Sequence, residues 1–230
     1  PINLQKKVDE GSGVERTIPR TFCVLPFIHF NIQQTGRITL CCVSDQPILE
    51  KGKELNIRTH SMQEAWHSKA MEDIRAKMLA GIPVSQCAVC YDAEARGLGS
   101  HRLQRNGEFL AVDVKGSSQA EHYPTVHFED LVSEETPKPY FFDVRFENLC
   151  NLRFVMCFPN WRSGVENDPV QRAWHGRSDP FSRVPNRFDN ITNWVESPLL
   201  LEELKDFSSE VKVIQLAGGE PFLSKLALKW

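Results

Sequence analysis

The clearest helical pattern of apolar and polar residues covers residues 61–80. Its apolar side chains recur every three to four residues, which places most of them on one face of a helix. Ser61 opens a Ser-x-x-Glu capping box, and Gly81 followed by Pro83 closes the pattern. The sequence therefore predicts one helix here, with its apolar face in the core.

Two short apolar runs in the C-terminal half predict β-strands, at residues 140–146 and 211–217. Between them, Ser197 and Pro198 predict the start of a helix that continues to about residue 207, because serine caps helices and proline suits the first turn. Strand, helix and strand in this order form a βα repeat, the unit of parallel sheets and barrels. In such folds the loops after the carboxyl ends of the strands carry the functional site.

The composition is that of a globular protein and gives no support for nucleic-acid binding. Of 230 residues, 41% are apolar and 25% are charged, and the formal net charge of -3 supplies no basic field for phosphates. The longest nearly apolar run, residues 22–30, is much shorter than the roughly 20 residues of a membrane-spanning helix. The first twenty residues contain no secretory signal pattern, so a cytoplasmic protein with reduced thiols is expected.

Seven cysteines form three groups along the chain, at 23, 41 and 42, at 87 and 90, and at 150 and 157. The first two groups offer four thiolates for one metal centre: Cys23, Cys41, Cys87 and Cys90. A C-x2-C turn lets two sulfurs converge, and a hairpin that turns at Thr35-Gly36 supplies the other two.

Four thiolates suit either a [4Fe–4S] cluster or a structural zinc ion, and the spacing does not decide between them. Buried cysteines without a metal are the simpler alternative, because a free thiol packs like a small apolar group. Cys42 is the reserve ligand, since a one-residue slip of its strand would exchange it for Cys41.

Several motifs together resemble radical S-adenosylmethionine (SAM) proteins that carry an auxiliary-cluster domain of the SPASM or twitch type. The motifs are Cys-Val-Leu-Pro-Phe-Ile-His-Phe at 23–30, Leu-Cys-Cys-Val at 40–43, Cys90-Tyr-x2-Glu94-x2-Gly97, the cysteine loop 150–157 and Gly-Gly-Glu-Pro at 218–221. The resemblance covers roughly residues 20–105 and 141–223. It implies an α/β fold: a small cysteine-rich α+β domain over residues 1–112, a linker over 113–139, and the first βα units of a truncated partial (β/α) barrel over 140–230.

The resemblance also implies cofactors and partners. In this family, three cysteines spaced C-x3-C-x2-C hold a second [4Fe–4S] cluster, whose open iron binds SAM for reductive cleavage and hydrogen abstraction. Cys150 and Cys157 would be two of these ligands, and the SAM amino group would meet a turn made of Gly218, Gly219, Glu220 and Pro221. The implied partners are a peptide or small-molecule substrate and an external electron donor.

The chain departs from the family pattern at two points. Phe154 stands where the middle cysteine of the loop is expected, so the loop offers two thiolates instead of three. Residues 140–230 also hold only two predicted strands, whereas a six-unit partial barrel needs roughly 180 residues. Two hypotheses follow: a radical SAM enzyme or part of one, or a non-catalytic relative that keeps the N-terminal metal centre as a scaffold or binding module.

Overall fold

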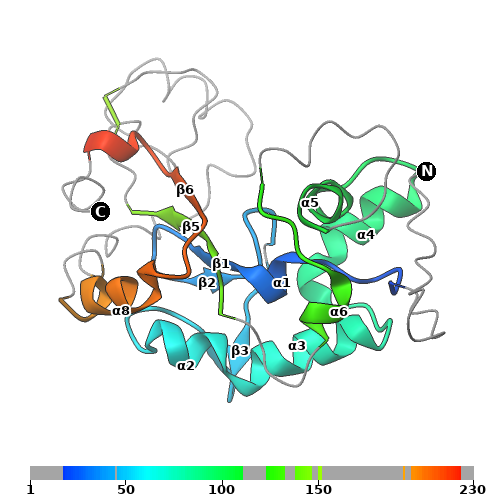
Figure 1. Cartoon of the computed structure of the whole chain (residues 1–230), viewed down its shortest axis with the longest axis horizontal. Helices are drawn as coiled ribbons and strands as arrows, with labels where there is room; N and C mark the ends of the chain where they lie inside the picture. Colours follow the sequence, from blue (N-terminus) through cyan, green and yellow to red (C-terminus); the bar gives the residue numbers. More distant parts are fainter. Residues whose placement is uncertain are drawn as a thin grey trace, which may run out of the picture.

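A four-stranded mixed sheet lies at the centre of the computed structural model (Figure 1). The structure describes residues 18–44, 46–110, 123–132, 138–146, 150–151, 194 and 198–223. The strand order is β2 (Ile38–Thr39), β1 (His29–Ile32), β5 (Phe141–Arg145) and β6 (Val213–Ala217). β1 pairs antiparallel with β2 and parallel with β5, and β5 pairs parallel with β6.

The predicted hairpin between β1 and β2 is confirmed. Gly36 adopts a φ of 78° in the turn and donates its backbone N–H to the Gln33 carbonyl at 2.8 Å. A Cβ at this position would lie 2.8 Å from the Asn56 side-chain oxygen, so both the backbone angle and the space favour glycine.

The predicted βα repeat in the C-terminal half is also present, as β5, α8 (Pro198–Ser208) and β6. The sheet joins strands from both sides of the predicted linker, because β1 pairs with β5 from His29↔Phe141 to Ile32↔Val144. The described residues thus show a mixed α/β fold with a partly parallel sheet, and its extension into a partial barrel stays a prediction.

The single helix predicted over residues 61–80 is wrong, because the structure contains two helices, α2 (Met62–Trp66) and α3 (Lys69–Leu79). The capping box at Ser61 is present at the start of α2. Ser68 starts α3 in the same way, since its hydroxyl accepts the Met71 N–H at 3.3 Å. A second serine cap therefore breaks the helix without interrupting its apolar face.

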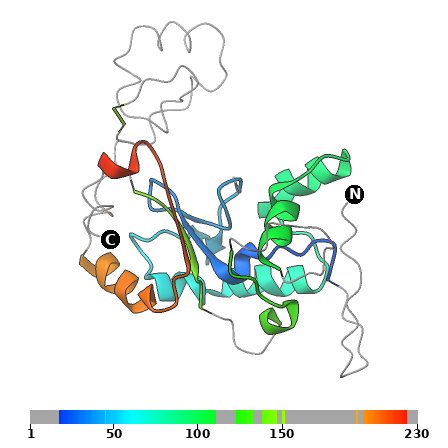
Figure 2. The ribbon, with the colours of Figure 1, turned by 45° about the horizontal axis from the view of Figure 1, so that its top comes forward.

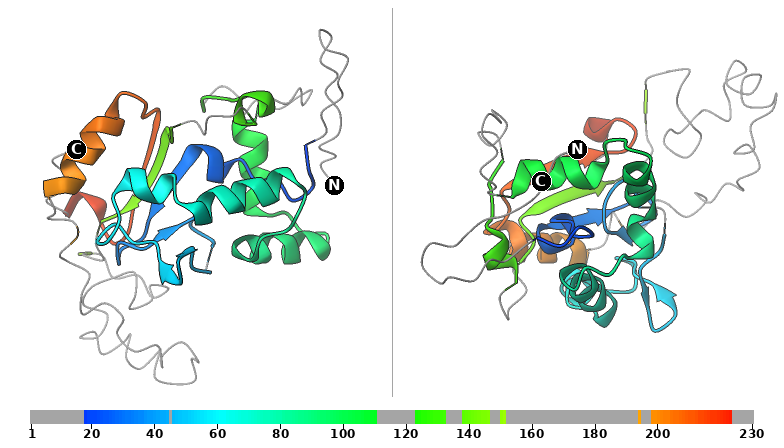
Figure 3. Two further views of the ribbon diagram at one scale, coloured as in Figure 1. Left: turned by 90° about the horizontal axis from the view of Figure 1, so that it is seen from below. Right: turned by 90° about the vertical axis from the view of Figure 1, so that its right-hand side faces the viewer.

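The helices α2 and α8 cover one face of the sheet (Figures 2 and 3). Phe30 of β1 lies 6.2 Å from the Trp66 ring of α2, and Phe142 of β5 lies 5.9 Å from the Phe207 ring of α8. The opposite face carries Phe141, which stacks at 5.4 Å on Phe109 of α5. This second face is covered by α5 at one end.

Shorter elements surround the sheet, and two of the helices carry residues of the candidate site. Residues 91–110, which gave no helix prediction, contain most of α4 and all of α5, separated by a bend where Gly97 has a φ of 75°. The remaining elements are α1 (Leu25–Ile28), β3 (Leu49–Glu50), β4 (Lys53–Glu54), η1 (Ser85–Cys87), α4 (Ala88–Ala95), α5 (His101–Phe109), α6 (Phe128–Leu131) and η5 (Pro221–Leu223).

Candidate metal centre

The four cysteines predicted as one ligand set line a single cavity. Cys23, Cys41, Cys87 and Cys90 all contribute to its wall, and their residues are only 4, 8, 7 and 5% exposed. Three apolar side chains (Leu25, Val43 and Val89) and three polar ones (Gln86, His101 and Arg102) complete the lining. Segments 64 residues apart in sequence, from Cys23 to Cys87, are thus brought to one place.

Cys23 is held in position by the side chain of Asn106 on α5. The Asn106 side-chain oxygen accepts the Val24 N–H at 2.8 Å, and its amide nitrogen donates to the Phe22 carbonyl at 2.9 Å. The two neighbours of Cys23 are therefore fixed by one fully buried amide. Sequence reasoning did not identify Asn106, because its partners are 82 and 84 residues away.

The structure distinguishes Cys41 from Cys42, which the sequence could not. Cys41 lines the cavity, and its carbonyl accepts the Thr39 hydroxyl at 3.1 Å and the Ser44 N–H at 3.2 Å. Cys42 is absent from the cavity lining, and its sulfur lies 3.7 Å from the His101 Nε2 atom. Cys41 is therefore the better candidate ligand.

The C-x2-C pair lies where η1 continues into α4. Cys87 ends η1 and donates its N–H to the Val84 carbonyl at 3.1 Å, and Cys90 follows in the first turn of α4. The Gln86 side chain links this turn to the segment just before β3 by donating to the Pro47 carbonyl at 3.0 Å. Both sulfurs consequently face the cavity from one side.

The thiols raise one another's pKa because they lie close together in space. Burial raises the pKa of Cys41 and of Cys87 to about 12, and it raises the pKa of Cys23 well above its usual value. Neighbouring thiols add to each shift, since two negative sulfurs near one another are unfavourable. In the absence of a cation these sulfurs are protonated, so a bound metal must displace the protons.

Arg102 supplies a positive charge in the wall of the cysteine cavity. Its guanidinium lowers the pKa of Cys23 and Cys87, although burial outweighs this effect. Arg102 is 3% exposed, donates to the Phe22 carbonyl at 2.6 Å and forms an ion pair with Glu94. Its guanidinium carbon also lies 5.4 Å from the centre of the Tyr91 ring. A positive charge here compensates the negative charge of a thiolate-bound metal.

The polar residues that follow the C-x2-C pair, among them Tyr91, Glu94 and Ser100, hold Arg102 and the Cys23 segment in place. Glu94 accepts a hydrogen bond from the Ser100 hydroxyl at 2.5 Å and from the Arg102 Nε atom at 3.1 Å. Tyr91 donates its hydroxyl to the Thr21 carbonyl at 3.0 Å, close to Cys23 in sequence. The repeated three-residue spacing of this motif was the available sequence signal, but it did not reveal the role of Arg102.

Four thiols can hold either a tetrahedral zinc ion or a [4Fe–4S] cluster. Within the described part of the chain, no group of three or more His, Cys, Asp or Glu side chains has an arrangement that could hold a metal ion. The shared cavity nevertheless brings all four cysteines to one place.

The parallel strands that precede the second predicted site end at the same edge of the sheet. Arg145 pairs with Ala217 at the ends of β5 and β6, and the turn that begins with Gly218 follows directly. Gly218 has a φ of 122°. Just before η5, the Glu220 carboxylate accepts the Phe222 N–H at 3.4 Å. Phe154 and Cys157 lie outside the described residues.

Comparison with known families identifies the same N-terminal region. The model of the SPASM iron–sulfur cluster-binding domain matches residues 23–91, which is less than a third of the chain and contains all four cavity cysteines. No curated protein and no solved structure matches the chain. Among the described helices, none has the length and apolar character needed to span a membrane.

Proposed function

We propose that the chain binds one [4Fe–4S] cluster through Cys23, Cys41, Cys87 and Cys90. The observation that carries this proposal is the single cavity lined by all four buried cysteines, which lie within the segment that matches an iron–sulfur cluster-binding domain. Such a cluster supplies one-electron chemistry when bound. The protein's part is to hold the thiols and to place Arg102 beside them.

We further propose that this cluster is the auxiliary centre of a radical SAM protein. What supports this is the parallel register of β5 and β6, whose last paired residues, Arg145 and Ala217, lie side by side at one edge of the sheet. In such a protein the substrate is a peptide or a small molecule, and an external donor supplies the electrons. The alternative is a non-catalytic module that retains only the N-terminal cluster.

Anaerobic reconstitution with iron and sulfide, followed by dithionite reduction with SAM, tests both proposals. We expect about four irons and four sulfides per chain and no 5′-deoxyadenosine, because Cys150 and Cys157 supply two thiolates where the family uses three. The Phe154→Cys variant should bind about eight irons and form 5′-deoxyadenosine.

The remaining results would each contradict one of the two proposals. One zinc ion per chain without sulfide would contradict the iron–sulfur cluster. A Phe154→Cys variant that binds about four irons and forms no 5′-deoxyadenosine would contradict the radical SAM proposal and favour the non-catalytic module. About eight irons and 5′-deoxyadenosine from the unaltered chain would show that Phe154 does not prevent SAM cleavage.

A further inference from the structure

The face of the sheet opposite α2 and α8 carries buried polar side chains. The strand register aligns Asn31 of β1 with Asp143 of β5, and Asp143 with Gln215 of β6, so all three lie on one face. Asn31 is fully buried and Asp143 is 2% exposed. A buried carboxylate is uncommon, because removing it from water is costly unless it is paired.

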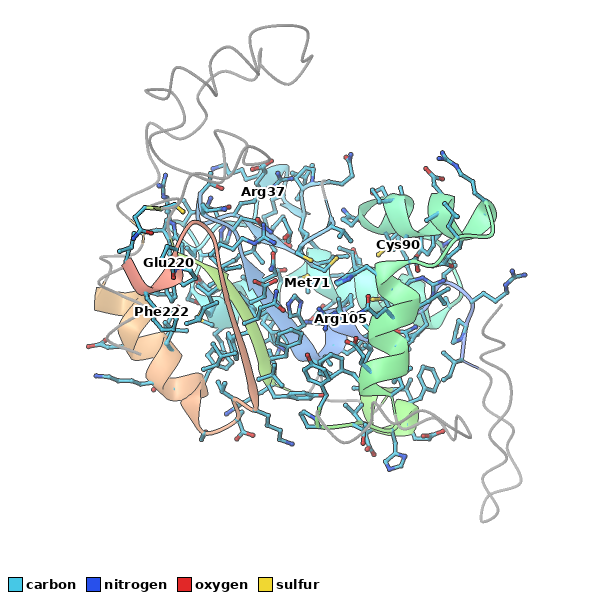
Figure 4. All side chains as sticks on the ribbon, turned by 90° about the horizontal axis from the view of Figure 1, so that it is seen from above. Arg37, Met71, Cys90, Arg105, Glu220 and Phe222 are labelled. Carbon is cyan, nitrogen blue, oxygen red and sulfur yellow. The ribbon has the colours of Figure 1, made fainter. Side chains whose placement is uncertain are left out.

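Three polar atoms on this face have no hydrogen-bond partner among the described residues. They are the Oδ1 atom of Asp143, the Nε atom of Arg145 and the Nε atom of Arg105. Arg145 follows Asp143 by two residues and so lies on the same side of β5. Arg105 reaches the strand from α5, with its guanidinium carbon 6.0 Å from the Phe141 ring centre (Figure 4).

The charges of this polar face act on one another. Burial raises the pKa of Asp143, and Arg145, Arg105 and a hydrogen bond from the Asn31 side chain oppose that rise, although the Oδ1 atom itself has no partner among the described residues. Glu108 accepts a hydrogen bond from Arg105 Nη1 at 2.7 Å and partly balances it. His29 is neutral here, since burial lowers its pKa to about 3. The face therefore presents one carboxylate acceptor beside two guanidinium donors.

This polar face lies close to the candidate metal centre. Arg105 belongs to α5, and the same helix carries His101 and Arg102, which line the cysteine cavity. A ligand held on the face would consequently lie near the metal centre.

We propose that this polar face binds the carboxylate end of an amino acid or a peptide, with the carboxylate on Arg145 and Arg105 and the adjacent N–H on Asp143. Guanidinium and carboxylate groups form strong charge-assisted hydrogen bonds, and the Oδ1 atom of Asp143, an acceptor, requires a donor. A ligand with only one of these groups leaves a buried partner unsatisfied. The inference rests on the proposed substrate role and names the group that is recognised, but its test requires neither iron nor SAM, so either proposal can fail without the other.

Thermal unfolding of the full, anaerobically prepared chain tests this binding with four probes. N-acetylglycine and glycine each combine a carboxylate with an N–H donor and represent the peptide and amino-acid sources. Acetate and N-methylacetamide each supply only part of this combination. We expect a saturable rise in unfolding temperature with at least one of the first two probes, and a smaller response to the last two at equal concentration.

Substitutions locate the effect. Asp143→Asn and Arg145→Met should each weaken the apparent affinity about tenfold or more, because each removes one charge-assisted contact. Lys53→Met, at an exposed position of β4, should leave the affinity unchanged. An equal response to all four probes, no saturable response to either amino-acid probe, or unchanged affinity in both variants would overturn the proposal.

The unfolding temperature without ligand separates a binding role from a structural one. An incompletely paired, buried Asp143 destabilises the free protein, so Asp143→Asn should keep or raise that temperature. A clear decrease would show that structural partners hold the carboxylate, and it would also overturn the proposal.

Discussion

Replacing Cys41 with alanine should remove most of the iron and sulfide that the chain binds. Cys41 is 8% exposed, lines the cavity and interacts electrostatically with Cys87 and Cys90, so its loss leaves a cluster with three cysteine ligands. Since metal binding contributes to folding, the variant should also unfold at a lower temperature. Iron and sulfide analysis after anaerobic reconstitution, together with thermal unfolding, measures both effects.

Cys42→Ala is the matched control, because it removes an adjacent thiol from the same turn. Its sulfur contacts His101 instead of lining the cavity, so this variant should keep its iron and its unfolding temperature. Iron loss from Cys42→Ala with iron retention in Cys41→Ala would show that the strand end is shifted by one residue from the register described here.

The largest expected loss of stability without removal of a thiol comes from Arg102→Met. This variant leaves Glu94 without its cationic partner and removes the donor to the Phe22 carbonyl. Breaking a buried ion pair by removing one partner costs about 3–5 kcal/mol. Because Glu94 is 20% exposed, we expect the lower end of that range, about 3 kcal/mol, in anaerobic urea unfolding.

Lys69→Met is the control for loss of a positive charge. Lys69 forms ion pairs with Glu72 and Asp73 on the exposed surface of α3, and such pairs contribute only about 0–1 kcal/mol. Equal destabilisation by the two substitutions would contradict the supporting role assigned to Arg102.

The elements predicted correctly from the sequence depend on local signals. Two short apolar runs predict β5 and β6, and a glycine in a turn predicts the hairpin at Gly36. The break between α2 and α3 was missed because the apolar periodicity continues through Ser68, although its hydroxyl caps a new helix.

The arrangement that positions the site depends on contacts between distant segments. The pairing of β1 with β5 joins residues 112 positions apart, as Asn31 and Asp143 show, and no local pattern specifies it. The sequence identified the four cavity cysteines by spacing alone. It could not identify Asn106 or choose Cys41 over Cys42, since these depend on tertiary packing and on which side of a strand end a side chain faces.

The central claim is that the four N-terminal cysteines alone hold a [4Fe–4S] cluster. Iron and sulfide analysis of the Cys150→Ala/Cys157→Ala double variant tests it most directly, because that chain retains every cavity cysteine and lacks both thiols of the second predicted site. We predict about four irons and four sulfides per chain after anaerobic reconstitution. Loss of the iron from this variant, or zinc in its place, would contradict the claim.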